Sequence, residues 1–302
     1  MTLQELVTNV GLIAAAMSLV SLVELAVPLF ARGAASEGRA AANFGLTGLT
    51  LVLNWAIGGA AAALALFLSI RGGGVLAPLG LSLPALVAIS VVTLDLSTYL
   101  AHRSMHLVPL LWRAHRVHHS DPFLDVSSTL RQHPLEGLWR FLWIIVPTWM
   151  LGLPLTGVVV YRLLSVIQAV FEHANIRLWR PLDRTLSLVW VTPNMHKVHH
   201  SRARKQTDSN YGNLFACFDR GLRTFRSADE AYDVVYGLDD VDPRRAKSFA
   251  GLMALPFVRA SSDSPSHALA SSKNTRISRG AAKTSAPGES ASMRTRSAGT
   301  SA

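Results

Sequence analysis

The sequence has one cysteine and few charged residues. Among its 302 residues, Cys217 is the single cysteine, and only 16% are Asp, Glu, Lys or Arg, whereas half are hydrophobic. One cysteine excludes an internal disulfide framework and a zinc cluster built from cysteines. On its own, Cys217 is expected to be a small buried hydrophobic residue. So little charge beside so much hydrophobicity is unusual for a soluble domain of this length and indicates a membrane protein.

Hydrophobic residues are concentrated in long runs near the N-terminus. A membrane-spanning helix takes roughly 20 residues, and three runs within residues 1–101 are long enough: 5–30, 44–70 and 79–101. These runs predict three transmembrane helices. The first run lacks a basic start, is too long for the apolar part of a signal peptide and is followed by further runs. We therefore interpret it as a span rather than as a cleaved signal.

The rest of the chain divides into a histidine-rich region and a tail. Residues 102–258 are more polar, apart from a hydrophobic stretch at 141–170 that is broken by Pro147 and by the segment 152–154. Thirty residues are too few for two full spans, so this stretch predicts a short hairpin that enters the membrane and returns. Residues 259–302 are Ser, Ala and Gly with scattered Lys and Arg, a composition that predicts a disordered tail.

Acidic residues are scarce relative to basic ones, 19 against 29, which gives a formal net charge of +10. Arg32 and Arg39 follow the first run, Arg71 stands alone after the second, and many arginines follow residue 102. The positive-inside rule then predicts a multi-pass protein whose histidine-rich region and C-terminus are cytosolic. No nucleic-acid recognition motif accompanies the basic residues, and nearby anionic lipid head groups explain them more simply. No nucleic-acid partner is expected.

Ten of the eleven histidines lie between residues 102 and 200, and their spacing is regular. One pair is spaced i, i+4 and two sets are spaced i, i+3, i+4, which places each group on one face of a helix. Neutral imidazole is the commonest side-chain ligand for transition metals, and helical bundles build metal sites from such faces. The predicted metal ligands are His102, His106, His115, His118, His119, His133, His173, His196, His199 and His200.

Ten candidate ligands are more than one metal ion needs, and they fit two ions with four or five ligands each. Imidazole ligands suit Fe, Zn, Cu or Ni, but a structural zinc site closes at four ligands and would leave about half of the set unused. Two irons facing an apolar cavity would suit O₂ activation beside a lipid C–H bond. That chemistry needs no protein base or nucleophile, so no catalytic residue beyond the metal ligands is predicted.

Four carboxylates are candidates to accept a hydrogen bond from the histidine ring nitrogen that does not bind the metal, a contact that metal-bound imidazoles usually make. Asp95 lies seven residues before His102, on the same helix face and near the end of a predicted span. A buried carboxylate in a membrane is expensive and is expected to be functional, so we expect Asp95 to accept an imidazole N–H. The other three supporting carboxylates lie close to the remaining histidines in sequence: Glu136, Glu172 and Asp208.

Several linked motifs run through residues 90–225. They are Asp95-x₃-Tyr99-x₂-His102-x₃-His106, His115-x₂-His118-His119, Arg131-x-His133-Pro134-x-Glu136, His173-Ala174-Asn175, His196-x₂-His199-His200 and Asn210-Tyr211-Gly212. Together they resemble the fatty acid hydroxylase/sterol desaturase superfamily of integral-membrane di-iron enzymes. The segment after Gly212 departs from the family's usual pattern, because Phe218 replaces another aromatic residue and Gly221 is displaced. This departure puts the local turn in doubt but removes no ligand.

The resemblance implies an all-α fold, an integral-membrane helical bundle with a cytosolic cap in which histidines line a di-metal centre. It also implies an oxidoreductase that hydroxylates, or desaturates, a C–H bond of a lipid with O₂ and two electrons, in lipid or sterol biosynthesis or modification. No His-Pro-Gly-Gly haem motif is present, so electrons are expected from a separate ferredoxin- or cytochrome b5-like donor with its reductase. Arg202, Arg204 and Lys205 are a candidate dock for an acidic donor, or else contact lipid phosphates.

The alternative from another class is a membrane metal-binding or transport protein with a non-catalytic histidine cluster. A transporter is expected to carry its ligands near the midplane of its spans. Here the first two hydrophobic runs contain no histidine, and the ten clustered histidines follow the third. The placement of the histidines therefore favours the enzyme.

Overall fold

The computed structural model describes residues 3–71 and 73–258, and in these ranges the protein is helical. Five long helices make up most of it: α1 (Leu3–Ala26), α2 (Ala40–Arg71), α3 (Leu83–Leu107), α5 (Pro134–Leu151) and α6 (Leu155–Glu172). No strand occurs in the described ranges, where the isolated bridges pair Pro28 with Ile176 and Trp190 with Phe215. The all-α class predicted from the sequence is confirmed for this part of the chain.

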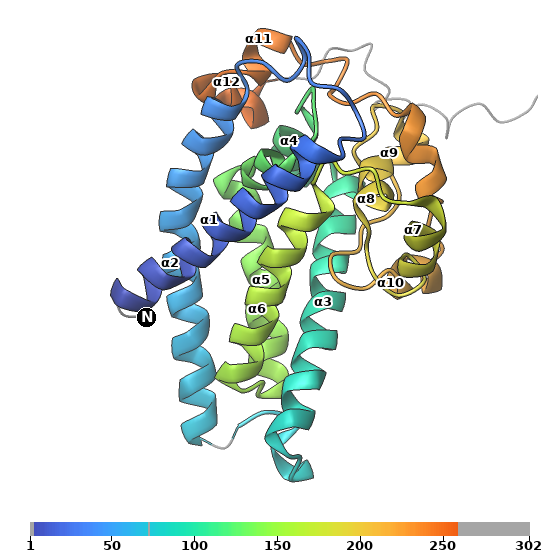
Figure 1. Ribbon diagram of the computed structural model, residues 1–302. Helices are drawn as coiled ribbons and strands as arrows, with labels where there is room; N and C mark the ends of the chain where they lie inside the picture. Colours follow the sequence, from blue (N-terminus) through green and yellow to red (C-terminus); the bar gives the residue numbers. More distant parts are fainter. Residues whose placement is uncertain (1–2, 72, 259–302) are drawn as a thin grey trace, which may run out of the picture. The chain divides into compact units, whose positions relative to one another are not determined.

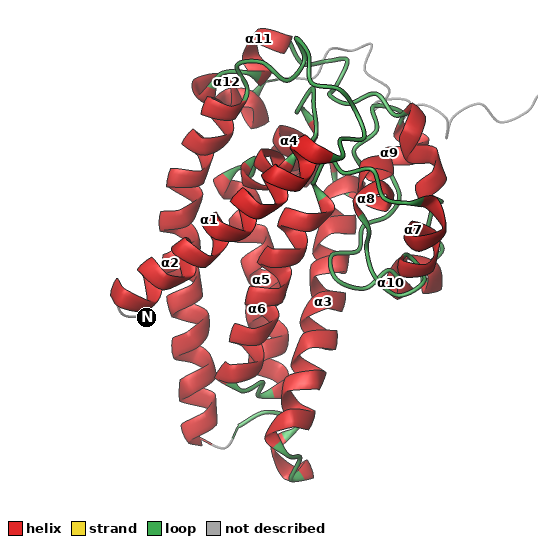
Figure 2. Cartoon of the chain, viewed as in Figure 1, coloured by secondary structure: helices red, strands yellow, loops and turns green. Residues whose placement is uncertain are grey.

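Shorter helices surround one end of the long ones. They are α4 (Pro109–His119), α7 (Arg180–Leu186), α8 (Pro193–His199), α9 (Arg204–Thr207), α10 (Cys217–Gly221), α11 (Pro243–Ala246) and α12 (Phe249–Ala254), with the 3₁₀ turns η2 (Val126–Leu130), η3 (Ala228–Asp233) and η4 (Leu255–Phe257). The 3₁₀ turn η1 (Ala77–Leu79) lies at the opposite end, in the connection between α2 and α3. Helices α2, α3, α5 and α6 run lengthwise beside one another, and α1 crosses them obliquely (Figure 1). The short helices are joined by long loops around α4 and α8 (Figure 2).

Prolines and a glycine set the boundaries of the helices that carry the site. Pro109 occupies the first turn of α4, where its missing N–H is not needed, and it ends α3 because it disfavours the helical conformation at Val108. The chain therefore turns between α3 and α4 without a loop. Helix α5 ends at Gly152, whose φ of 69° is left-handed and suits glycine. Helix α6 begins after Pro154, which completes a tight helical hairpin.

The α5–α6 hairpin is longer than the one expected at residues 141–170. Each arm has 18 residues, because α5 already begins at Pro134. At the tip, the backbone N–H groups of Val75 and Leu76 donate to the carbonyls of Met150 and Leu151 at 3.0 and 3.2 Å. The tip thus lies against the connection between α2 and α3, and the hairpin reaches as far as these helices do. The polar start of α5 concealed this length in the sequence.

Two of the described helices, α3 and α6, are long and apolar enough to cross a membrane. Within α1, residues Val10–Ala26 form a shorter apolar helix. Helices α1, α2 and α3 correspond to the three predicted runs, although α3 continues beyond residue 101 and carries the first two histidines to its C-terminal end. The number of spans and the side of the membrane on which the histidines lie remain predictions.

Two further expectations concern the C-terminal part. Cys217 begins α10 and is exposed, so the expectation that it is buried is wrong. The neighbours Ala216 and Asp219 supply the buried side of this turn instead. The tail at residues 259–302 lies outside the described residues.

Candidate metal centre

Nine of the ten predicted ligands lie in two compact groups of buried histidines. In each group the candidate ligand atoms all lie within 4.8 Å of one another. The first group is His102, His106, His115, His119 and His199, and the second is His118, His173, His196 and His200. Four or five imidazoles converging on one point are the donor set of a metal site, and they occur here twice.

Helices α4 and α8 each contribute to both groups. On α4, His115 and His119 belong to the first group and His118 to the second. At α8, His199 belongs to the first group, whereas His196 and the C-capping His200 belong to the second. Each three-histidine set that the spacing placed on one helix face is thus divided between the two groups. Adjacent residues of a helix differ by about 100° in direction, so a His-His pair can serve two neighbouring sites.

Backbone carbonyls fix the tautomers of four of these histidines. The Nδ1 atoms of the four lie 2.7–3.1 Å from carbonyl oxygens, in the pairs His102–Tyr211, His118–Arg131, His173–Ala169 and His199–Ser209. A carbonyl oxygen can only accept, so each Nδ1 must carry the proton. The Nε2 atom of each ring then offers a lone pair. A bound metal requires this arrangement of its imidazole ligands.

The Nε2 atoms lie too close together to be stable without a shared positive charge. In the second group, Nε2 of His118 lies 3.1 Å from Nε2 of His173. Both rings have their proton on Nδ1, so two lone pairs face each other. In the first group, Nε2 of His106 and Nε2 of His199 are buried without a hydrogen-bond partner. A cation between the rings would satisfy all of these atoms, so both groups fit a metal ion.

Burial keeps the imidazoles neutral. It lowers the pKa well below the ordinary value for His115, His118, His119, His196, His199 and His200. For His173, burial lowers the pKa to about 4, even though the hydrogen bond to the Ala169 carbonyl opposes the shift. A neutral ring is the form that binds a metal, so no proton has to be removed before binding near pH 7.

Three of the four predicted carboxylates lie beside the histidines. Oε2 of Glu136 is 3.1 Å from Nδ1 of His115, and Oδ1 of Asp208 is 3.4 Å from Nδ1 of His106. Glu172 lies at the second group, with Oε1 3.8 Å from both Nδ1 of His173 and Nε2 of His196. The other oxygen of Glu172 is buried without a partner. Glu172 can therefore reach a metal in the second group as well as orient a ring.

Asp95 does not have the predicted role, because it contacts no imidazole in the described part of the chain. Its two oxygens accept the backbone N–H groups of Leu214 and Phe215, each at 3.0 Å, and one also accepts from the side chain of Asn213 at 3.3 Å. Asp95 thus fastens the loop that follows Tyr211 to α3. Its connection to His102 is indirect, through the Tyr211 carbonyl.

His133 belongs to neither group. Its Nδ1 accepts the backbone N–H of Leu135 at 3.2 Å, which makes it the N-cap of α5, and its Nε2 lies 3.3 Å from the Met253 carbonyl. Both ring nitrogens are therefore engaged away from the other histidines. The geometry gives His133 a capping role in place of the predicted ligand role.

The Asn210-Tyr211-Gly212 segment is a structural part of the site that residue spacing alone did not reveal. Asp219 accepts the backbone N–H groups of Tyr211 and Gly212, both at 2.8 Å, and the hydroxyl of Thr224 at 2.7 Å. This turn presents the Tyr211 carbonyl to His102. The departure from the family pattern at Phe218 therefore leaves the turn intact. The sequence showed the Asn-Tyr-Gly motif, but the motif acts through backbone groups: the N–H groups of Tyr211 and Gly212 hold the turn, and the Tyr211 carbonyl contacts His102.

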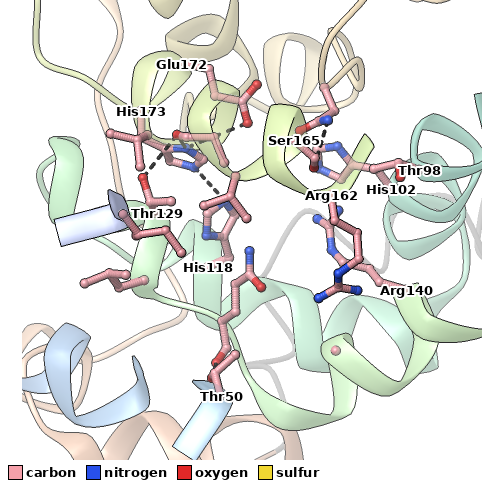
Figure 3. A pocket seen from close by; sticks show the side chains of 18 of the residues that line it. Thr50, Thr98, His102, His118, Thr129, Arg140, Arg162, Ser165, Glu172 and His173 are labelled. Carbon is pink, nitrogen blue, oxygen red and sulfur yellow. Dashed lines mark hydrogen bonds and ion pairs between the residues drawn. The ribbon is translucent and has the colours of Figure 1, made fainter. Parts of the chain in front are cut away.

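A cavity of about 310 Å³ leads from between the long helices to the histidines. Side chains from α1, α2, α3, α5 and α6 line it, including Ile13, Ile144 and Val170. At its inner end it reaches His102 of the first group and His118 and His173 of the second (Figure 3). His196 of the second group also lines it. A cavity of this volume accommodates a small apolar ligand or part of a lipid chain.

The fold and the site together define a class: a helical protein in which two imidazole clusters border a cavity between long helices, two of which are apolar enough to cross a membrane. Residues 87–224 match the fatty acid hydroxylase family. This match confirms the family resemblance predicted from the motifs.

The relatives of the chain support the same assignment. It is 30% identical over 174 residues to an ornithine lipid hydroxylase, OlsE, of Rhizobium tropici, a match that covers 57% of this chain and 50% of the relative. It is 32% identical over 145 residues to the alkylglycerol monooxygenase of Homo sapiens, covering 48% of this chain and 31% of the relative. The chain thus spans half or less of the length of these relatives. No solved structure matches it.

Proposed function

We propose that the protein is a membrane-bound di-iron oxygenase that hydroxylates a C–H bond of a lipid. The observation that carries this proposal is the position of the two histidine groups at the inner end of the cavity. The relatives that are named as lipid-hydroxylating and alkylglycerol-oxidising enzymes support hydroxylation over desaturation. The net reaction takes a C–H bond, O₂, two electrons and two protons to a C–OH group and water.

The nine clustered histidines would hold two iron ions, which supply the activation of O₂. The protein's own contribution is geometric. Carbonyl and carboxylate partners keep the proton on Nδ1 and leave Nε2 for the metal, and burial keeps water and protons away from the rings. The apolar walls hold the substrate chain with one carbon near His102 and His118. Glu172 is available as an additional oxygen ligand on the cavity side.

Electrons would come from a separate redox protein. The candidate dock of Arg202, Arg204 and Lys205 is partly neutralised, because Arg202 pairs with Asp239 at 3.1 Å and Arg204 pairs with Asp208 at 2.8 Å. Asp208 also lies beside His106. A donor that binds over Arg204 would therefore be close to the first histidine group. We place this surface, like the histidines, on the cytosolic side.

The test is a comparison of the lipids of the source organism with the gene deleted and then restored. Complementation uses either the wild type or His199→Ala at equal expression. A lipid heavier by one oxygen than its precursor, present only with the wild type, supports a hydroxylase and names the substrate. A product lighter by two hydrogens would indicate a desaturase. Unchanged lipids together with altered metal uptake would favour the transport alternative and overturn the proposal.

A further inference from the structure

Two arginines line the cavity in the middle of the α5–α6 hairpin. Arg140 lies on α5 and Arg162 on α6, and both guanidinium groups are drawn in the cavity in Figure 3. Helix α6 is one of two helices in the described ranges that are apolar enough to cross a membrane. A charged side chain within such a segment is expensive and by default indicates a functional partner.

Arg162 has no protein partner in the described ranges. No ion pair or hydrogen bond joins its guanidinium group to another residue of the described ranges, although the group lines the cavity. The hydroxyl groups of the same cavity behave differently. Thr98 pairs with the Tyr161 hydroxyl, Thr129 donates to the Ala169 carbonyl at 3.1 Å, and Ser165 accepts from Asn213 at 3.0 Å. These hydroxyl groups have hydrogen-bond partners within the protein, whereas Arg162 has none among the described residues.

Arg140 is a second positively charged group in the same cavity. Its Nε donates to Oε1 of Glu136 at 2.9 Å, so this one carboxylate offsets its charge. Glu172 is the carboxylate that lines the cavity, but it lies ten residues beyond Arg162 on α6, about 15 Å along the helix axis. Near Arg162 the cavity therefore carries a positive charge that no carboxylate of the described residues pairs with, and a guanidinium shielded from bulk water binds an anion strongly.

We infer that Arg162, assisted by Arg140, binds an anionic group of the lipid substrate, a carboxylate or a phosphate. This inference rests on the proposed function and narrows its substrate class to acidic lipids. A planar guanidinium can donate two parallel hydrogen bonds to either group.

The experiment measures lipid binding to the full-length, metal-loaded protein in a neutral detergent by a scintillation proximity assay. The probes form two pairs: hexadecanoic acid with methyl hexadecanoate, and dihexadecanoyl phosphatidic acid with dihexadecanoylglycerol. The wild type should bind the acidic member of at least one pair about tenfold more tightly than the neutral member. The pair that shows the preference identifies the group as carboxylate or phosphate.

The variant Arg162→Gln should lose the preference while its affinity for the neutral lipid changes less than about twofold. Arg162→Lys should retain part of it, because the charge remains but the paired hydrogen bonds do not. Arg71→Gln, the same change at the end of α2 and outside the cavity lining, should retain all of it. A wild type without preference, or an unchanged preference in Arg162→Gln, overturns the inference, and the wild-type result decides even if a variant fails to fold.

The binding assay tests this inference, and the deletion experiment tests the proposed function, so one can fail while the other stands. If acidic lipids bind through Arg162 and no lipid is oxidised in the deletion experiment, the anion site stands and the oxygenase proposal fails. If a neutral lipid is hydroxylated and Arg162→Gln changes neither its binding nor its conversion, the oxygenase proposal stands and the anion site fails.

Discussion

At the scale of single residues, the histidines differ in what their two ring nitrogens do. In His199, Nδ1 is bound to the Ser209 carbonyl and Nε2 is buried without a partner. In His133, Nδ1 caps α5 and Nε2 reaches the Met253 carbonyl. The first ring is prepared for a metal and the second is already satisfied. The same residue type therefore has two roles that only the neighbours distinguish.

This difference predicts opposite results for two alanine variants. His199→Ala should lower the metal content of the purified protein and abolish lipid oxidation, because the first group loses an Nε2 donor. His133→Ala should keep the full metal content and lose about 1 kcal/mol of stability, the usual cost of a lost N-cap. Metal is measured by elemental mass spectrometry and stability by thermal melting. Full metal in His199→Ala, or metal loss in His133→Ala with the fold intact, would contradict the assignment.

Asp95 provides a second prediction at this scale. In Asp95→Ala, the backbone N–H groups of Leu214 and Phe215 would be buried without an acceptor. Each unsatisfied buried donor costs about 1–3 kcal/mol, so a clear fall in melting temperature is expected. The control is Asp242→Ala, which removes an exposed carboxylate that pairs with Arg244. If Asp95 instead supported a ligand directly, the variant would lose metal, and its melting temperature would equal that of the wild type once both proteins were stripped of metal.

Sequence reasoning found most of the histidines that converge but not the groups that surround them. Histidine spacing is visible in the sequence, and nine of the ten candidates do converge. The carbonyls that fix the tautomers are not visible, because every residue has one and only the fold decides which is near. For the same reason, the helical periodicity that joined Asp95 to His102 could not show that the Asp95 carboxylate turns towards Leu214.

At the scale of elements, the site depends on how α4 and α8 are placed between the two groups. Hydrophobic run length predicted α1, α2 and α3 well, because a span must be long and apolar. It underestimated the α5–α6 hairpin, whose first turns contain Glu136 and Arg140. These polar residues face the first histidine group and the cavity. A run-length criterion therefore starts this helix too late, because its first turns carry polar side chains that face the site.

The tip of the hairpin gives a prediction for this scale. Gly74 has φ 103°, and a Cβ atom there would collide with the backbone of Leu151 and Gly152. Gly80 has φ 57° and no atom within 4 Å of its Cβ position. Gly74→Ala should therefore destabilise the protein strongly, whereas Gly80→Ala should cost about 1–2 kcal/mol from the left-handed conformation alone. Thermal melting compares the two, and equal losses would show that the tip does not pack on the α2–α3 connection.

At the scale of the whole described structure, the two histidine groups connect elements that are otherwise joined by loops. The first group joins α3, α4 and α8, and the second joins α4, α8 and the end of α6. Without a cation, the Nε2 lone pairs of His118 and His173 remain 3.1 Å apart and repel each other. The long helices have hydrophobic contacts of their own, such as Leu94 with Val158 and Tyr161 in one core cluster. The cap around the histidines depends more on the metal than the helices do.

Removal of the metal should therefore loosen the cap and spare the long helices. A metal at 1,000 times its dissociation constant stabilises the folded state by about 4 kcal/mol, so chelation should lower the melting temperature markedly. Limited proteolysis should then cut the loops between α6 and α10 before it cuts α3, and added Fe²⁺ should restore protection. His199→Ala treated in the same way should show a smaller change, because its first group already lacks a ligand. If the wild type lost its metal completely and kept both its melting temperature and its cleavage pattern, the cap would be held by protein contacts alone, and the metal would have no structural role.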